Sequence, residues 1–243
     1  PEKLKGESQL EGNVILFLIF SITVTSFVIE SFHGPSRTWE PIGHWVSGMG
    51  IADGTVVAAY WVHMLSICVF FVLIPLSKHM HLVMAVPNVF FHDVEPPGKM
   101  RPLAVGDDGK AVSLEDLDID SFGVSTYTQY TWRQLIDGWS CTSCARCQDV
   151  CPAYASGKGL NPMEVIHDVR NYANEHAPLL LAGEQPEETM IQRITDEAVW
   201  ACTTCNACVD VCPLYIEHVP KLTDLRRNAM METMEYPEEL NTA

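Results

Sequence analysis

The chain has 243 residues, a length compatible with one or two domains, and a net charge of −16. The acidic excess lies after residue 91, because residues 92–243 contain eleven Lys/Arg and twenty-five Asp/Glu. A surface this acidic repels a phosphate backbone, so we expect no nucleic-acid partner. It indicates either an ordinary solvated surface or one that attracts a basic protein.

Two apolar runs in residues 1–91 are long enough to cross a bilayer. The first centres on Val14–Ile29, which has no charge, and extends to a span of about residues 13–32. The second covers residues 55–76, where the only groups that ionise at neutral pH are His63 and, weakly, Cys68. Buried helices of a soluble protein are the alternative. Pro75 would kink the second helix, which membrane helices tolerate.

The distribution of basic residues predicts the orientation of these two spans. Lys3 and Lys5 precede the first span and Lys78 follows the second, whereas the loop 33–54 contains only Arg37. The positive-inside rule therefore predicts that both outer flanks, and everything after the second span, lie in the cytoplasm and the loop lies outside. We expect a multi-pass protein of the cytoplasmic membrane of a prokaryote. The apolar residues 82–91 are too short for a third span, and we expect them at the interface or leading out of the bilayer.

Two histidines are candidate ligands of a metal group in the membrane. His63 lies within the second span and His81 follows it by eighteen residues, which is five whole turns of a regular helix. Both rings would then project from one face, about 27 Å apart along the axis. Intramembrane ionisable residues are usually functional, although a structural hydrogen bond is the alternative for either ring.

The second half of the chain is predicted to be a linker followed by helices. Residues 92–126 are rich in Pro, Gly and acids, which is typical of a surface linker. Apolar spacing predicts a helix over residues 126–139, and Asn161-Pro162 predicts an N-cap opening a helix to about residue 175. Further helices are expected over residues 186–201 and 219–234.

Eight of the nine cysteines form two copies of the pattern C-x2-C-x2-C-x3-C-P. The copies contain Cys141, Cys144, Cys147 and Cys151, and Cys202, Cys205, Cys208 and Cys212. This run resembles the [4Fe–4S] motif of bacterial-type ferredoxins, in which the fourth cysteine serves the other cluster. The resemblance implies Cys141, Cys144, Cys147 and Cys212 for one cluster, and Cys202, Cys205, Cys208 and Cys151 for the second. Zinc sites and disulfides are the alternatives, but they do not typically show a repeated Cys-Pro fourth position.

A wider resemblance covers nearly the whole chain. The stretch from His63 to His81 resembles the last helix of the respiratory nitrate reductase gamma subunit, which implies that each histidine binds a b-type haem. The runs Val199-Trp200-Ala-Cys202 and Glu217-His218-Val-Pro220 are similar to membrane-bound iron–sulfur oxidoreductases of the heterodisulfide reductase D-related family. Several such proteins are electron-transferring-flavoprotein:menaquinone oxidoreductases. The first span contains no partner haem ligand, and His33 and His44 in the outer loop could serve at most the outer haem. The cysteine-rich domains of this family are also not in the sequence, so we expect a partial chain, with the upstream helices missing from it or supplied by another chain.

The expected fold is mainly α: transmembrane helices followed by an α-helical ferredoxin domain with two [4Fe–4S] clusters. The expected domains are a membrane domain at 1–91, a linker at 92–126 and the ferredoxin domain at 127–243. The resemblance implies electron transfer from a soluble flavoprotein through the clusters and haem to menaquinone in the bilayer. The alternatives are an iron–sulfur subunit of a heterodisulfide-reducing or hydroxyacid-oxidising enzyme, and a haem-free membrane-anchored ferredoxin.

Overall fold

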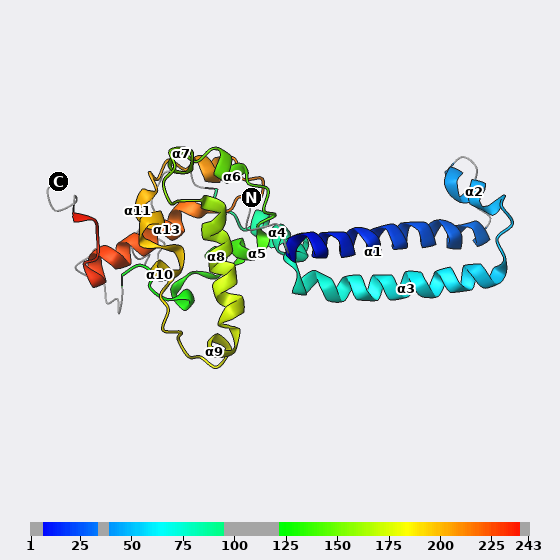
Figure 1. Cartoon of the computed structure of the whole chain (residues 1–243), viewed down its shortest axis with the longest axis horizontal. Coiled ribbons are helices and arrows are strands. Elements are labelled where there is room, and N and C mark those ends of the chain that lie inside the picture. The colour runs from blue at the N-terminus through cyan, green and yellow to red at the C-terminus, as the bar shows by residue number, and fades with distance from the viewer. Residues whose placement is uncertain (1–6, 34–38, 95–121, 239–243) are drawn as a thin grey trace. The chain divides into compact units, whose positions relative to one another are not determined.

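The computed structural model of the chain describes residues 7–33, 39–94 and 122–238 (Figure 1). Every regular element in these ranges is a helix, and they contain no strand. This confirms the mainly α class. The chain forms two compact units, residues 1–80 and 81–243. Most of the expected linker, 92–126, lies outside the described residues.

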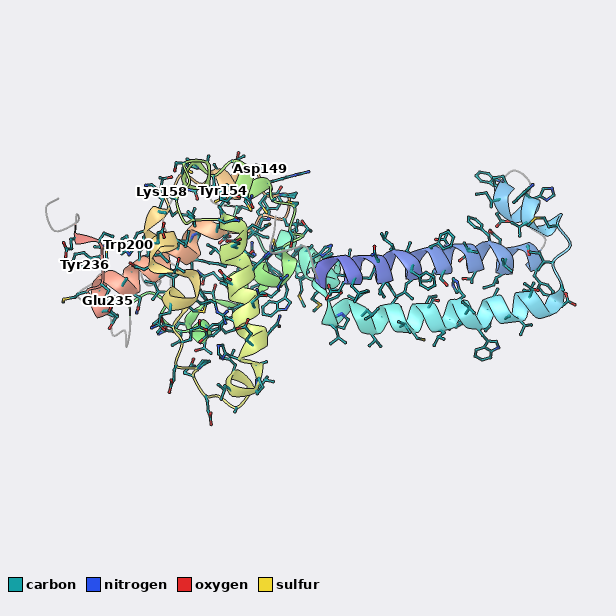
Figure 2. All side chains as sticks on the ribbon, in the orientation of Figure 1. Asp149, Tyr154, Lys158, Trp200, Glu235 and Tyr236 are labelled. Carbon is teal, nitrogen blue, oxygen red and sulfur yellow. The ribbon has the colours of Figure 1, made fainter. Side chains whose placement is uncertain are left out.

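The first unit is built from two long helices that lie side by side, α1 (Glu7–Glu30) and α3 (Asp53–Leu76) (Figure 1). A short helix, α2 (Pro41–Ser47), lies in the connection between them. Both long helices are long and apolar enough to cross a membrane, over Leu10–Glu30 and Asp53–Leu76. Only 17% and 6% of these apolar stretches are buried, and Figure 2 shows their side chains projecting outwards. A core helix of a soluble protein would have most of its apolar surface covered.

The helix α3 ends at Leu76, and this corrects the premise that His63 and His81 lie on one helix. Pro75 lies in its last turn, and Ser77 is extended, with φ −123° and ψ 173°. A short 3₁₀ turn, η2 (Lys78–Met80), follows, and His81 is the first residue of the next helix, α4 (His81–Phe90). The five-turn relation requires an unbroken helix, so it does not hold. The two histidines therefore do not share one helix face.

The second unit contains α4 and the remaining helices, which surround α8 (Pro162–Glu175) (Figure 1). These are η4 (Tyr127–Gln129), α5 (Trp132–Ser140), α6 (Arg146–Asp149), α7 (Pro152–Ala155), α9 (Ala177–Leu181), α10 (Met190–Ile194), α11 (Asp196–Ala201), α12 (Ala207–Asp210), α13 (His218–Asn228) and the π-helical turn η5 (Ala229–Thr233).

Local sequence explains where several of these helices begin. Asn161 caps α8 by accepting a hydrogen bond from Met163 N at 3.1 Å, and Pro162 occupies the first turn, as expected. The helix expected over residues 126–139 begins later, at Trp132. The preceding residues form the 3₁₀ turn η4, and Thr131 caps α5 by accepting from Gln134 N.

Two expected helices are interrupted. The stretch 186–201 forms two short helices, α10 and α11, because Thr195 between them has a positive φ of 76°. A single α-helix cannot continue through that backbone conformation. The stretch 219–234 is α-helical only to Asn228 and then widens into η5.

The core of the second unit lies around α8. Val165 and Val169 pack with Tyr172 in one buried cluster, together with residues of α10, α11 and α13. Met163 and Ile166 face a second cluster that includes three of the motif cysteines. The unit also includes α4, which packs on α5, so the division between units lies before the boundary expected at residue 91.

Candidate iron–sulfur site

The two cysteine motifs adopt the same local conformation. The first cysteine of each copy caps the end of a helix, with Cys141 following α5 and Cys202 following α11. A short helix then contains the third cysteine, namely Cys147 in α6 and Cys208 in α12. The repeat seen in the sequence is therefore also a repeat of backbone structure.

Each motif contains two non-glycine residues with positive φ, at equivalent positions. These are Ser143 (56°) and Ala145 (64°) in the first copy, and Thr204 (55°) and Asn206 (60°) in the second. Such conformations are uncommon outside glycine and concentrate at functional sites. Here they turn a backbone N–H back towards the first sulfur: the N–H of residue 143 donates to Cys141 Sγ, and that of residue 204 to Cys202 Sγ, both at 3.4 Å.

The eight motif cysteines surround two cavities, four at each. Cavity 1 is lined by Cys141, Cys144, Cys147 and Cys212. Cavity 2 is lined by Cys151, Cys202, Cys205 and Cys208. The two enclose about 330 and 340 Å³ of space free of atoms, part of it open to solvent. These sets are the same two sets of four that the ferredoxin resemblance implied, with the fourth cysteines exchanged between motifs.

A set of four cysteine sulfurs around a shared space fits the donor set of a [4Fe–4S] cluster. Within the described ranges, no three His, Cys, Asp or Glu side chains converge as they would on a single metal ion. The walls between the sulfurs are mainly apolar, with Met163, Leu214 and Ile216 at cavity 1 and Leu160, Val219 and Leu222 at cavity 2. An apolar wall limits solvent access, which is one determinant of cluster potential.

The cavities disfavour free thiolates. Burial, with a smaller contribution from neighbouring thiols, raises the pKa of Cys147 to about 12 and that of Cys208 to about 12. Burial also raises the pKa values of Cys141, Cys202 and Cys212. At neutral pH these sulfurs would be protonated unless a bound cation stabilised the thiolate. The iron of a cluster supplies that positive charge.

Two histidines lie beside the cavities, His218 buried and His167 half-buried. His218, at the start of α13, lines both of them, and burial followed by nearby Lys221 lowers its pKa to about 4. His167, on α8, borders only cavity 1; its Nε2 lies 3.0 Å from Ser143 Oγ and 3.7 Å from Cys141 Sγ. Burial, with Arg170, lowers the pKa of His167 to about 4. Both rings are therefore neutral at physiological pH.

A buried polar network fixes the helices that hold the motifs. Asp137 on α5 and Lys221 on α13 are fully buried and form an ion pair. Asp137 also accepts from Arg133 Nη1 at 3.2 Å and from Glu217 N at 3.3 Å, and Lys221 Nζ donates to Glu217 O at 3.0 Å. Every charge in the network has an opposite charge beside it, which buried ion pairs require. The network joins the helix before the first motif to the helix after the second.

A second anchor holds the entry to the second motif. Arg226 on α13 donates to Val199 O, at 3.0 Å from Nε and 2.6 Å from Nη2, and to Cys202 O at 2.5 Å. Its guanidinium also lies over the Trp200 ring, 5.4 Å from the centroid. These contacts satisfy the last carbonyls of α11, which have no partner within the helix.

The supporting residues were not identified from the sequence. Asp137, Lys221, His167 and His218 come from three helices far apart in the chain, and no local pattern predicts that they meet. The i, i+4 spacing of Arg133 and Asp137 in the sequence is typical of an ion pair on a helix. The neighbouring residues in the sequence did not indicate that this pair would be buried.

The two candidate haem ligands lie in different units. His63 on α3 is half-buried, and its Nδ1 lies 2.9 Å from Thr25 Oγ1 on α1. That hydroxyl also lies 2.7 Å from Ser21 O, to which it can only donate. With its single proton used there, the hydroxyl accepts from His63 Nδ1–H, and Nε2 keeps its lone pair. His81 is half-buried at the start of α4 in the second unit.

Comparison with known proteins supports the iron–sulfur assignment. Residues 133–213 match the 4Fe-4S dicluster domain family. The whole chain aligns with the EtfAB:quinone oxidoreductase of Syntrophomonas wolfei at 29% identity, over 38% of that protein. It is 30% identical to the probable iron-sulfur-binding oxidoreductase FadF of Bacillus subtilis, over 89% of the chain and 36% of that protein. The chain is similar to these two iron–sulfur oxidoreductases.

These similarities support the resemblance to membrane-bound iron–sulfur oxidoreductases seen in the sequence. A probable membrane-anchored ferredoxin of Chromohalobacter salexigens is also similar, 35% identical over 52% of the chain and 22% of that protein. Heterodisulfide reductase subunits of Methanosarcina species match as well, for example over 39% of the chain. The chain spans less than two fifths of the length of the first two relatives. No solved structure matches the chain.

Proposed function

We propose that this chain is the membrane-bound electron-transfer part of an iron–sulfur oxidoreductase. It would accept electrons from a soluble flavoprotein and deliver them to menaquinone in the bilayer, using two [4Fe–4S] clusters and b-type haem. The observation that carries the proposal is the pair of four-cysteine cavities in one helical unit.

The protein's own groups would bind and tune the clusters rather than react. The cysteines of cavities 1 and 2 are the proposed ligands, and bound [4Fe–4S] clusters supply one-electron transfer. The backbone N–H groups of residues 143 and 204 donate to first-cysteine sulfurs, and hydrogen bonds to sulfur adjust cluster potential.

The membrane location rests on α1 and α3. Their apolar side chains are largely exposed, and the lysine pattern favours a cytoplasmic position for the second unit. A relative named a membrane-anchored ferredoxin supports the same location. The flavoprotein donor and the quinone acceptor are proposed by analogy with the relative named EtfAB:quinone oxidoreductase.

The haem proposal rests on His63 and His81, with the partner ligands coming from outside this chain. The hydrogen bond between His63 and Thr25 supports it, because a ligating histidine usually has its other ring nitrogen held by a hydrogen bond. His81, in a separate helix, would serve a second haem.

Metal analysis and electron paramagnetic resonance of the purified chain test the central proposal. We expect iron and acid-labile sulfide, with reduced [4Fe–4S] signals from two interacting clusters. Zinc in place of iron would overturn it. A pyridine-haemochrome assay tests the haem separately: b-type haem should be present in the wild type and fall by about half in His63→Ala, because His81 would still hold the second haem. Thr23→Val is the control, because Thr23 lies on α1 but bonds only to Ile19 O in the described structure.

A second candidate is a membrane-anchored ferredoxin without haem. The break between α3 and α4 favours it, because it removes the geometric argument for a pair of haem-binding histidines. Absence of the haemochrome signal together with intact clusters would select this candidate. The similarity to heterodisulfide reductase subunits supports a third candidate, a subunit of an enzyme of that kind. Affinity purification separates it from the main proposal: other subunits of such an enzyme should co-purify with the chain, and a flavoprotein should not.

A further inference from the structure

The helix α4 has two sharply different faces. Its outward side chains are all apolar and exposed: Leu82 (53%), Val83 (52%), Val86 (71%) and Phe90 (78%). At 100° per residue these four lie within about 100° of arc, so they form one continuous stripe. A soluble domain seldom leaves such a stripe in water.

The opposite face of α4 is fixed by polar bonds to the rest of the second unit, residues 81–243, which we call the ferredoxin unit. Asn88 is fully buried; its Nδ2 donates to Leu214 O at 2.9 Å and its Oδ1 accepts from Arg133 Nη1. Arg133 Nε donates to Phe91 O at 3.0 Å, and Ser140 Oγ donates to Met84 O at 3.0 Å. The rings of His92 and Tyr215 stack 4.3 Å apart, beyond the helix end. The apolar stripe is therefore held rigidly outwards.

These bonds place α4 directly behind cavity 1. Leu214, which accepts from Asn88, also lines cavity 1 and follows its ligand candidate Cys212 by two residues. Cavity 2 lies beside α11, and in the view of Figure 1 α11 and α4 are on opposite sides of α8. Cavity 1 is therefore next to α4, and cavity 2 is farther from it.

The covalent connection indicates what covers the stripe. The membrane-length helix α3 ends at Leu76 and α4 begins at His81, which limits the separation of these two Cα atoms to about 18 Å. With α3 in the bilayer, α4 cannot leave the vicinity of its surface. An uncharged apolar stripe on a helix at that position matches the lipid headgroup–acyl boundary.

We propose that α4 is an interfacial helix whose apolar stripe rests in the lipid surface, with cavity 1 as the membrane-side cluster site. The proposal rests on the proposed function, because it requires α3 to be a membrane span. A soluble protein partner and a second copy of this chain are the competing occupants.

Nitroxide labels in liposomes test the position of α4. The full chain with Cys68→Ser would be labelled at Val86→Cys on the stripe, at Leu181→Cys as an exposed apolar control on α9, and at Val72→Cys within α3. Accessibility to oxygen, which concentrates in lipid, is compared with accessibility to a water-soluble nickel complex. We expect residues 72 and 86 to favour oxygen and residue 181 to favour nickel.

The three labels separate the possible failures. If residue 72 reports lipid but residue 86 reports water, the inference about α4 is overturned while the membrane span stands. If residue 72 also reports water, the proposed membrane location itself fails. Low accessibility of residue 86 to both reagents would mean that protein covers the stripe, which also overturns the inference.

The order of the cavities is tested with liposomes that contain a gadolinium chelate on a lipid headgroup. The variant Cys205→Ala would retain only the cavity 1 cluster, and Cys144→Ala only the cavity 2 cluster. We expect gadolinium to accelerate spin relaxation of the cluster more strongly in Cys205→Ala. Equal acceleration, or a stronger effect in Cys144→Ala, would overturn the order.

Discussion

At the scale of single residues, the cysteine sites depend on side chains that never touch a sulfur. Asp137 and Lys221 are fully buried and hold α5 and α13 together, and both helices border cysteine motifs. A buried ion pair adds little net stability against an apolar pair of the same size, but removal of one partner leaves a buried charge without compensation. These two residues should therefore be sensitive to single substitutions.

We expect Lys221→Met to reduce the free energy of unfolding of the ferredoxin unit by roughly 3–5 kcal/mol, because Asp137 loses its closest counter-charge. Chemical denaturation in detergent, followed by the visible absorption of the clusters, measures the change. Lys158→Met, at an exposed lysine, is the matched control. Equal stability of the two variants would contradict the importance assigned to the network.

The neutral ring of His167 should adjust only one cluster. Its Nε2 lies near Cys141 Sγ and Ser143 Oγ at cavity 1. With the ring proton on Nε2, the N–H donor beside sulfur favours the more negative, reduced cluster, so His167→Ala should then lower the reduction potential of the cavity 1 cluster and leave the other unchanged. Redox titration by electron paramagnetic resonance measures this shift, with His176→Ala at the end of α8 as control. Equal shifts of both clusters would argue for a general structural effect.

The cysteine sets were predictable because the two motifs resemble that of bacterial-type ferredoxins, in which the fourth cysteine of each motif serves the other cluster. The side chains around them were not. Asn88, Arg133 and Lys221 come from α4, α5 and α13, and their meeting depends on tertiary packing that no local pattern encodes.

At the scale of elements, the ends of helices were predicted well where a capping residue or proline indicates them. They were predicted poorly where one residue with a non-helical backbone conformation ends the helix. Asn161-Pro162 marks the start of α8, and the structure follows it. Ser77 and Thr195 interrupt expected helices, yet neither is glycine or proline. The break after Leu76 matters most, because the histidine pairing was inferred from an unbroken helix.

Gly123 shows how closely the elements pack behind the site. Its φ is +71°, and an added Cβ would lie 2.2 Å from Asp224 O and 2.6 Å from Asn228 N, both backbone atoms of α13. We expect Gly123→Ala to destabilise the ferredoxin unit by clearly more than Gly157→Ala. Gly157 has a similar φ of +78° but open space around it, so its substitution should cost only about 1–2 kcal/mol of backbone strain.

Thermal unfolding of the two glycine variants measures the difference. Because both residues share the positive φ, the additional loss in Gly123→Ala isolates the steric clash with α13. Similar melting temperatures would indicate that α13 can move away from residue 123 without cost.

At the scale of the whole molecule, the two cavities are completed by residues from both motifs. Cys151 belongs to the first copy but lines cavity 2, and Cys212 belongs to the second copy but lines cavity 1. Neither copy of the motif alone supplies all four cysteines of one cavity.

This exchange predicts which substitutions should have equivalent effects. We expect Cys212→Ala and Cys144→Ala to show the same residual spectrum, that of the cavity 2 cluster. We expect Cys151→Ala and Cys205→Ala to show that of the cavity 1 cluster. Iron content should fall by about half in all four, since each removes one ligand from one cluster. If Cys151→Ala instead matched Cys144→Ala, the ligands would be grouped by motif and not by cavity.

The exchanged fourth cysteines also set the order in which the protein can be completed during synthesis. Residues are made from the N-terminus, so the four cysteines of cavity 2 are all present once Cys208 has been added, whereas cavity 1 waits for Cys212. Both sets remain incomplete until the second motif is made. A ribosome paused between residues 151 and 202 would hold a chain with the four thiols of the first motif and no finished site. This interval is therefore the one most exposed to oxidation and to capture of the wrong metal.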